Sequence, residues 1–370
     1  MRILYLSNSM NLGGGVQKCI FMLASRYKKE KNEVFVASSG GEYIDELKKS
    51  GITHYKIINP ENKNPLNIFK NFLTLYKIIK DNKIELIHSH HRMTTLYAKV
   101  LSRILKVKTI HSAHLTTTDK KFMTKKTLNN LPIISVSKGV KNGLVDYYGL
   151  NQNAIKVIYN SIEFNNKNSE KSSIFKEEKE SGKFIIGVVS RLEEVKGINI
   201  FLAAISDFIK KNKELEISAF IFGSGTLEKE LKEFTSRNNL NSVVNFMGNV
   251  TNISDYMKDF DIIVQSSYQE GLPLSLIEAT SLGIPIIATD IPGTNEVAIN
   301  DYNAMLVNVA SSEEISRAIK KIYGNKELKR NLGLKSKEHF NNNFKKENYY
   351  NEHMAFYKKV LYGSIEKGEF

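Results

Sequence analysis

Short apolar runs alternate with longer amphipathic segments along the whole chain. An apolar run predicts a buried strand, and apolar positions recurring three and four residues apart predict a helix with one buried face. In the first half, the pattern predicts strands at residues 2–7, 33–37, 54–58, 84–88, 107–111, 133–136 and 155–158, with helices at 16–27, 68–80, 92–105 and 138–148. In the second half, it predicts strands at residues 184–190, 216–222, 243–247, 261–265, 285–289 and 304–307, with helices at 198–210, 227–237, 273–282, 313–323, 326–340 and 346–362.

This alternation predicts an α/β fold with two domains. Strands separated by helices form parallel sheets with helices on both faces, and 370 residues are too many for one ordinary core. Residues 166–183 are polar and charged, which predicts a linker between a domain of residues 1–165 and a domain of residues 184–345. Doubly wound sheets bind ligands at the carboxyl ends of their strands, so a ligand is expected in a cleft between the domains.

The composition indicates a location. Cys19 is the single cysteine, so no intrachain disulfide can form, and a reducing, cytoplasmic compartment is the simplest interpretation. The apolar start of the chain ends at Leu6 without a signal-peptide cleavage site. No apolar stretch approaches the roughly 18 residues that cross a bilayer. We therefore expect a protein that is soluble or peripheral to the membrane.

The positive charge lies in the first half of the chain. Residues 1–165 carry 26 Lys and Arg against 11 Asp and Glu, whereas the remaining residues carry 27 against 28. A bias in composition would affect both halves, so the asymmetry favours an anionic partner for the first half, such as a membrane surface, a phosphorylated substrate or nucleic acid. No nucleic-acid-binding module is recognisable and the second half is not basic, so nucleic acid is not expected as the partner.

The strongest chemical signal is the segment EGLPLSLIEA, which begins at Glu270. Pro273 suits the first turn of a helix. The first N–H groups of that helix, at Leu274 and Ser275, combine with the helix dipole to make a site for a diphosphate. A carboxylate does not bind phosphate but accepts hydrogen bonds from hydroxyls. Glu270 and Glu278 therefore predict sugar or ribose hydroxyls as ligands.

A second signal precedes this segment. A predicted buried strand ends at Ser190, and Arg191 and Lys196 follow at the start of a helix. Arginine offers a planar fork for phosphate oxygens, and lysine offers a compact positive charge. Two basic residues in a loop are usually only solvated, but opposite the helix after Glu270 they would bind a diphosphate from both sides.

These segments resemble those of the retaining glycosyltransferases of family 4, which have the GT-B fold. That family has a strand ending in Arg-Leu with Lys-Gly shortly after, then Gly-x-Gly, then Glu-Gly-x-Pro-x-x-x-x-Glu-Ala. The matching positions are Arg191-Leu192, Lys196-Gly197, Gly223-Ser224-Gly225 and Glu270 to Ala279. The resemblance covers essentially the whole chain and is most specific over residues 184–300. It implies two Rossmann-like domains facing across a cleft, with the last helix, about 346–370, crossing back to the first domain.

The resemblance also implies roles on the donor side. Arg191 and Lys196 would bind the donor diphosphate, Glu270 would face the hydroxyls of the donor sugar, and Glu278 would face the ribose. Residues 291–296 lack the paired glycines that are usual in the family, which leaves the sugar preference open. The other implied donor-binding residues are Gly14, Gly15, Gly223, Gly271, Leu272, Pro273, Leu274 and Ser275.

Histidines are the candidates in the first half. His111 resembles the strand-end histidine that approaches the donor sugar, and His114 could take the same role. The histidines within residues 88–91 lack carboxylates at metal-ligand spacing, so they are expected to line the acceptor side or to lie partly in the core. His91, His114 and Ser137 are the candidate acceptor-side residues.

Neither a metal nor another cofactor is expected. Residues 259–261 spell Asp-x-Asp, which other glycosyltransferases use to bind a divalent metal, but here the segment opens a predicted buried strand, as it does in the GT-B family. The resemblance implies retention at the anomeric carbon. Because no residue stands out as a covalent nucleophile, we expect a front-face route in which a donor phosphate oxygen helps to deprotonate the acceptor.

The acceptor is indicated only indirectly. Residues 120–128 place four lysines around Phe122 and Met123, a pattern that suits a membrane surface as well as a solvated helix face. The favoured function is transfer from a UDP-sugar to a lipid-linked saccharide or polysaccharide precursor at the inner face of the plasma membrane. The alternative is a nucleotide-sugar epimerase of the same fold, which would consume the donor without an acceptor.

Overall fold

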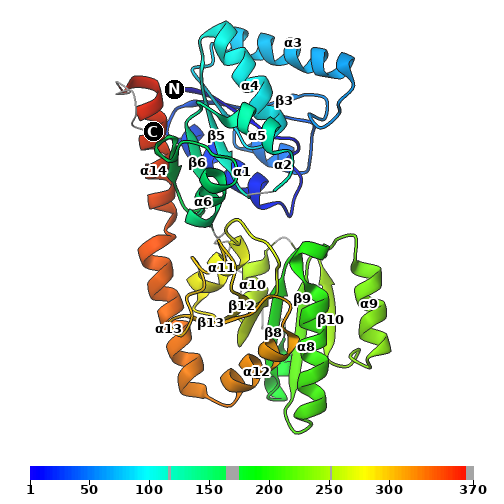
Figure 1. Cartoon of the computed structure of the whole chain (residues 1–370). Coiled ribbons are helices and arrows are strands. Elements are labelled where there is room, and N and C mark those ends of the chain that lie inside the picture. The colour runs from blue at the N-terminus through cyan, green and yellow to red at the C-terminus, as the bar shows by residue number, and fades with distance from the viewer. Residues whose placement is uncertain (116–117, 164–174, 251, 364–370) are drawn as a thin grey trace. The chain divides into compact units, whose positions relative to one another are not determined.

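The computed structural model describes residues 1–115, 118–163, 175–250 and 252–363, and these residues form two compact units (Figure 1). The first unit comprises Met1–Asn160 and the chain from Lys346 on, and the second comprises Ser161–Lys345. Each unit has its own parallel sheet with helices packed on it. The predicted α/β class with two Rossmann-like domains is therefore confirmed.

The first sheet has seven parallel strands in the order β3-β2-β1-β4-β5-β6-β7. The order reverses between β1 and β4, which are paired side by side. In doubly wound sheets, ligands bind at the carboxyl ends of the strands at such a reversal. The strands are β1 (Arg2–Leu6), β2 (Glu33–Ser38), β3 (Thr53–Lys56), β4 (Leu86–Ser89), β5 (Lys108–Ala113), β6 (Ile133–Ser135) and β7 (Ile155–Val157).

Alternating side chains of β1 pack on the two faces of this sheet. Ile3 and Tyr5 share a core cluster with α1 and α14, whereas Leu4 and Leu6 share another with α3 and α4. This alternation is the expected period of two along a strand. The helices of the first unit are α1 (Gly15–Lys29), α2 (Tyr43–Lys49), α3 (Pro65–Asp81), α4 (Arg92–Leu105), α5 (Lys121–Leu128), α6 (Lys138–Asp146) and α14 (Lys346–Tyr362), with a 3-10 turn, η1, at Gln152–Ala154.

The last helix, α14, belongs to the first unit. Its Tyr357 is fully buried, and the Tyr357 hydroxyl lies 3.2 Å from the Tyr5 hydroxyl of β1. Tyr27 of α1 donates a hydrogen bond of 2.8 Å to the carbonyl of Tyr350. Aromatic rings with hydrogen-bonded hydroxyls thus attach this distant part of the sequence to the first sheet.

The second sheet has six parallel strands in the order β10-β9-β8-β11-β12-β13, and its order reverses between β8 and β11. The strands are β8 (Phe184–Val189), β9 (Ile217–Phe222), β10 (Val244–Gly248), β11 (Ile262–Gln265), β12 (Ile286–Thr289) and β13 (Ala304–Val307). The helices are α7 (Lys176–Glu180), α8 (Ile198–Lys211), α9 (Glu228–Arg237), α10 (Ile253–Met257), α11 (Leu274–Leu282), α12 (Ser312–Tyr323) and α13 (Lys326–Asn343), with a 3-10 turn, η2, at Glu194–Lys196.

The predicted linker is too long. Residues 164–174 lie outside the described residues, but Phe175 is buried, with its ring centroid 4.1 Å from that of Phe220. Helix α7 follows and packs on β8. The polar composition of this segment predicted a linker, but the buried ring of Phe175 packs on the second sheet. The segment from Phe175 on therefore belongs to the second unit.

No helix in the described parts of the chain is both long and apolar enough to span a membrane.

Candidate functional site

The predicted donor-side residues lie at the reversal of strand order in the second sheet. Arg191 and Lys196 follow β8, and the segment from Glu270 to Ser275 follows the neighbouring β11. Parallel strands bring their carboxyl ends to one edge, so both loops emerge together there. The sequence signals therefore lie where a doubly wound sheet binds its ligand.

Lys196 and Glu270 form an ion pair. The Lys196 Nζ atom lies 2.7 Å from Glu270 Oε1, and only 16% and 8% of the two side chains are exposed. Ser267 donates a second hydrogen bond of 2.7 Å to the same Oε1 atom. Residue spacing did not predict this pairing, because the two residues were expected to bind different parts of a ligand.

The loops carrying this pair are bonded to each other. The Ser266 hydroxyl donates to the Gly197 carbonyl at 2.8 Å, and the Tyr268 N–H donates to the Val195 carbonyl at 2.8 Å. Gly197 has a φ of +59°, and a Cβ there would lie 2.2 Å from the Ser266 carbonyl oxygen. A glycine is thus required for the close approach that brings Lys196 to Glu270.

The two glycines after β9 likewise allow a close approach of two backbone segments, here beside Arg191. A Cβ at Gly223 would lie 1.9 Å from the Ser190 carbonyl oxygen, and one at Gly225 would lie 2.3 Å from the Leu192 carbonyl oxygen. The loop after β9 therefore lies directly on the loop after β8. The Arg191 side chain is exposed and makes no hydrogen bond or ion pair with the described residues.

A carboxylate joins these two loops. Glu193 accepts hydrogen bonds from the Thr226 N–H at 3.2 Å and from the Thr226 hydroxyl at 2.8 Å. These bonds favour the ionised form and hold the pKa of Glu193 below its usual value.

Helix α11 begins one residue later than predicted. Pro273 has an extended backbone, with ψ of 113°, and is the N-cap, so the first helical residue is Leu274. The Pro273 carbonyl accepts from the N–H groups of Leu276 and Ile277, both at 3.2 Å. Within the described residues, the N–H groups of Leu274 and Ser275 donate no hydrogen bond, which leaves them free for an anion.

The remaining donor-side candidates support this helix start. Gly271, Leu272 and Pro273 are buried. A Cβ at Gly293 would lie only 2.2 Å from the Gly271 carbonyl oxygen, so a glycine is needed there. Glu278, in the second turn of α11, is 5% exposed. Its expected contact with a ribose stays a prediction.

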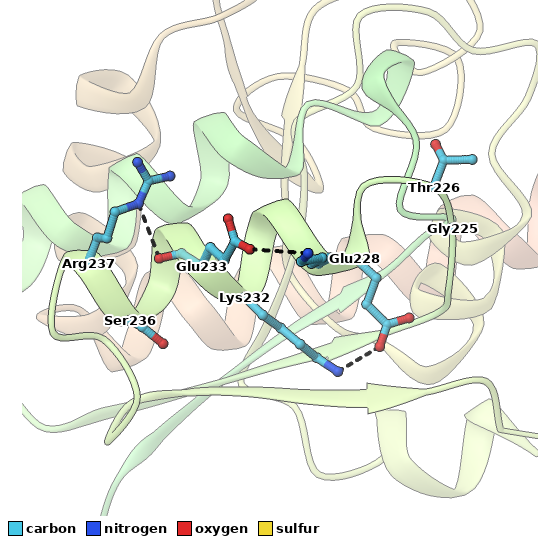
Figure 2. A pocket seen from close by; sticks show the side chains of 8 residues that line it. Gly225, Thr226, Glu228, Lys232, Glu233, Ser236 and Arg237 are labelled. Carbon is cyan, nitrogen blue, oxygen red and sulfur yellow. Dashed lines mark hydrogen bonds and ion pairs between the residues drawn. The ribbon is translucent and has the colours of Figure 1, made fainter.

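A separate hollow of about 930 Å³ lies beside α9 (Figure 2). Two lysines of its lining form ion pairs along that helix: Lys232 Nζ lies 2.7 Å from Glu228 Oε1, and Lys229 Nζ lies 4.0 Å from Glu233 Oε1. Arg237, also in the lining, donates to the Glu233 carbonyl at 3.4 Å. Such exposed pairs contribute little stability. The hollow contains none of the predicted site residues.

In the first sheet, the predicted glycines lie at the equivalent edge. Gly13 has a φ of +81°, Gly14 is the N-cap of α1, and Gly15 is the first residue of that helix. They follow β1, one of the two strands at the reversal of order. The glycine turn before a helix is thus in the predicted place, and its contact with a donor stays a prediction.

His111 does not end its strand as predicted, because β5 continues to Ala113. The side chain is buried, and His111 Nδ1 lies 2.8 Å from the Thr95 hydroxyl oxygen. His114 is the first residue after β5 and is half-buried. The apolar run at Val107–Ile110 suggested an early end, but Ser112 and Ala113 pair with β6 and extend the strand.

The other acceptor-side candidates have structural partners. Ser137 is buried at the N-cap of α6, where its hydroxyl accepts from the Val140 N–H at 3.0 Å. His91 is the N-cap of α4, and its Nδ1 accepts from the Asn8 N–H at 3.3 Å. Both lie at the carboxyl edge of the sheet, where they can still border a ligand.

The Asp-x-Asp segment is used in ion pairs. Asp259 pairs with Lys179, and Asp261 Oδ1 lies 2.5 Å from Lys329 Nζ while Asp261 Oδ2 accepts from the Ile185 N–H at 2.8 Å. Within the described ranges, no cluster of three His, Cys, Asp or Glu residues could hold a metal ion.

Buried histidines in the first unit have depressed pKa values. Burial lowers the pKa of His111 and His114 to about 3 and that of His353 to about 4. It also holds the pKa of His88 and of His90 well below the usual range. Removing an imidazolium from water disfavours the charged form. These side chains are therefore neutral at neutral pH.

The first unit is expected to lose stability in mild acid. Below a pH of about 6.5, these histidines bind protons in the unfolded chain but not in the folded one, because their folded-state pKa values are lower. Each such histidine therefore lowers the free energy of unfolding by about 1 kcal/mol between pH 7 and pH 5.5. Urea unfolding at both pH values, followed by hydrogen exchange in each unit, checks this. The second unit, whose one histidine is His339, is the internal control, and an equal loss in both units would contradict the prediction.

Two family models match the two halves of the chain. Residues 13–165 match the model described as Glycosyltransferase Family 4, and residues 169–339 match Glycosyl transferases group 1. An uncharacterised glycosyltransferase of Methanocaldococcus jannaschii is 30% identical over 331 residues, which is 84% of this chain and 81% of that protein.

Two further proteins are similar over nearly their full lengths. The N,N'-diacetylbacillosaminyl-diphospho-undecaprenol alpha-1,3-N-acetylgalactosaminyltransferase of Campylobacter jejuni is 27% identical over 360 residues, 90% of this chain and 92% of that protein. The crystal structure of HepE from Anabaena in complex with UDP-glucose superposes with a TM-score of 0.85 at 19% identity, covering 97% of this chain and all of that one. The structural likeness shows the fold, and the sequence matches confirm the resemblance: the chain belongs to the family 4 glycosyltransferases and is a transferase with the GT-B fold.

Proposed function

We propose that the chain transfers a sugar, with retention, from a UDP-sugar to a lipid-linked saccharide or polysaccharide precursor of the cell surface. The observation that carries the proposal is the ion pair of Lys196 with Glu270, the residue whose loop leads to the free N–H groups of α11. A cation and a helix start suit a diphosphate, and a carboxylate suits a sugar hydroxyl. The printed names of two similar proteins support the two substrates: UDP-glucose for HepE, and a diphospho-undecaprenol acceptor for the Campylobacter enzyme.

The charged groups would act on the leaving diphosphate. The bond between the anomeric carbon and the diphosphate oxygen breaks, and the acceptor oxygen bonds to that carbon on the same face. The acceptor proton passes to a phosphate oxygen of the leaving group. Arg191, Lys196 and the amides of Leu274 and Ser275 would stabilise the negative charge that develops there, so we propose that no metal takes part.

The carboxylates would position the sugar donor. Glu270 uses Oε1 for Lys196 and Ser267, and its other oxygen can accept from a sugar hydroxyl. We assign the ribose hydroxyls to Glu278 by family resemblance. We assign contact with the donor sugar to His111 or His114, also by family resemblance.

A surface on the first unit suits an anionic membrane. Helices α3, α4 and α5 are neighbours, because α4 packs against both others. Each exposes large apolar side chains, among them Leu66 (69% exposed), Phe69 (59%) and Phe122 (77%). Residues 62–126 carry 14 Lys and Arg against 3 Asp and Glu. Apolar side chains surrounded by lysines bind anionic lipid by insertion and by charge attraction.

Loss of this apolar surface is expected to weaken membrane binding. The double variant Phe69→Ser/Phe122→Ser should cosediment with vesicles containing anionic lipid at least about tenfold less strongly than the wild type, because two inserted rings are lost. Leu334→Ser is the matched control, since Leu334 is 56% exposed on α13 of the second unit. Equal binding by the double variant, or equal binding of the wild type to neutral vesicles, would contradict the prediction.

The function is tested by incubating the chain with radiolabelled UDP-glucose, UDP-galactose, UDP-N-acetylglucosamine or GDP-mannose and a polyprenyl-diphosphate saccharide. Transfer of label to the lipid, with retained anomeric configuration in the product, is the expected result. Donor conversion that does not require the acceptor would identify the epimerase alternative instead.

A further inference from the structure

Three histidine rings lie in contact beneath the carboxyl edge of the first sheet. His88 is fully buried on β4, and its ring centroid is 4.1 Å from that of His90, which directly follows the strand. The His90 ring is 5.2 Å from that of His114, at the end of β5. His90 is thus held between one buried ring and one half-buried ring.

Both nitrogens of His88 are bonded. His88 Nδ1 lies 2.6 Å from the Tyr357 hydroxyl of α14, and Nε2 lies 2.7 Å from the Ser112 hydroxyl of β5. These bonds fix the His88 ring, and through ring contact they fix the plane of His90.

His90 has one nitrogen with a partner and one without. His90 Nδ1 lies 2.9 Å from His114 Nε2, whereas His90 Nε2 is buried and has no hydrogen-bond partner among the described residues. A neutral imidazole carries one proton, so one of its nitrogens donates and the other accepts. The bond therefore runs in one of two directions, and the direction decides the tautomers of both rings.

The lack of a partner at His90 Nε2 decides which of the two rings donates the hydrogen bond. If His114 donated, His90 would carry its proton on Nε2, and an N–H donor would be buried with nothing to accept it. Such orphaned donors are rare in folded proteins. If His90 donates from Nδ1, the buried Nε2 is a bare acceptor. His114 then accepts on Nε2 and carries its own proton on Nδ1.

We propose that His90 is a positioning residue that fixes His114 as the neutral Nδ1–H tautomer, so that His114 donates a hydrogen bond to an oxygen of the transferred sugar. The assignment of the tautomers stands on the first unit alone. The assignment of the sugar as the ligand rests on the proposed function. A neutral donor suits an uncharged sugar oxygen, and it does not compete for the diphosphate as an imidazolium would.

The tautomer is measured directly in the unliganded protein. In a ¹H–¹⁵N spectrum of histidine side chains at pH 7.5, the bare nitrogen of each neutral ring resonates far from the protonated one. The structure predicts Nδ1–H for His114, with no proton on its Nε2. Because a free histidine side chain prefers Nε2–H, an Nε2–H tautomer at His114 in the wild type would overturn the proposal.

Two substitutions separate the hydrogen bond from ring packing. His90→Phe keeps a ring against His88 but has no donor, so His114 is expected to return to the Nε2–H tautomer. His90→Asn places an amide donor near the position of Nδ1 and is expected to retain Nδ1–H at His114. Unchanged His114 signals in His90→Phe would refute the positioning role. The signals of His54 and His339, which lie outside this cluster, are expected to stay in place and report on folding.

Activity adds a second readout. With the acceptor assay above, His90→Phe should lower kcat about tenfold with a smaller change in KM, the loss expected for one hydrogen bond that strengthens in the transition state. His90→Asn should recover most of that loss. Equal defects in both variants would assign His90 to structure alone. An inactive wild type with a His114 Nδ1–H signal would reject the proposed function and leave the tautomer assignment intact.

Discussion

Lys196→Ala is expected to lower the rate of sugar transfer by about 10²–10³ without unfolding the protein, because it removes one preorganised cation from the developing charge of the diphosphate. Lys196 is partly exposed and pairs with Glu270 at 2.7 Å, so its loss leaves no cavity in the core. Glu270 keeps its hydrogen bond from Ser267. The rate is measured as label transferred from the nucleotide-sugar to the lipid acceptor at saturating donor.

Lys232→Ala is the matched control for this prediction. Lys232 also pairs with a glutamate at 2.7 Å, in the same unit, but on the exposed face of α9 (Figure 2). Its removal should leave the transfer rate within about twofold, since exposed ion pairs contribute little. A Lys196→Ala enzyme as fast as Lys232→Ala would show that the ion pair at the strand reversal has no role in transfer.

Gly223→Ala is expected to destabilise the second unit by about 3 kcal/mol or more and to abolish transfer. Gly223 has a φ of +129°, and a Cβ there would lie 1.9 Å from the Ser190 carbonyl oxygen. That carbonyl belongs to the backbone directly before Arg191, so the loop that carries the arginine must move. Urea unfolding, followed in the second unit by hydrogen exchange, measures the loss.

Gly40→Ala separates the cost of backbone strain from the cost of the steric clash. Gly40 has nearly the same φ, +131°, but a Cβ there would meet nothing within 4 Å. Its substitution should cost only the backbone strain, about 1–3 kcal/mol. If Gly223→Ala costs no more than Gly40→Ala, the close approach of the loops after β8 and β9 is not required.

Strong local signals made most of the fold predictable from the sequence. The helices at Arg92–Leu105 and Lys346–Tyr362 begin and end where the pattern of apolar positions predicts. The predicted element boundaries were wrong where the contacts of one or two residues decide the structure against the local pattern. Phe175 lies in a charged stretch and still anchors that stretch to the second unit, and the pairing of Ser112 and Ala113 with β6 extends β5 beyond its apolar run.

The candidate site was predictable as a set of positions but not as a set of interactions. The motif placed Lys196 and Glu270 on loops after two predicted strands, yet their ion pair depends on the close approach at Gly197, which a linear pattern does not encode. The bond between His90 and His114 likewise depends on the pairing of β4 with β5. The exposure of the apolar side chains on α3 was not predicted, because the burial of a helix face depends on which neighbours cover it.

Calorimetric titration of the wild type and of Lys196→Ala with UDP and with GDP, without added metal, is the first measurement to make. The wild type is expected to bind UDP, and Lys196→Ala is expected to bind it at least about 100-fold more weakly, because a charge-assisted contact to phosphate is lost. Binding of GDP in place of UDP would change only the base of the donor. A wild type that binds neither nucleotide, or a Lys196→Ala variant that binds as tightly as the wild type, would contradict a diphosphate site at the start of α11.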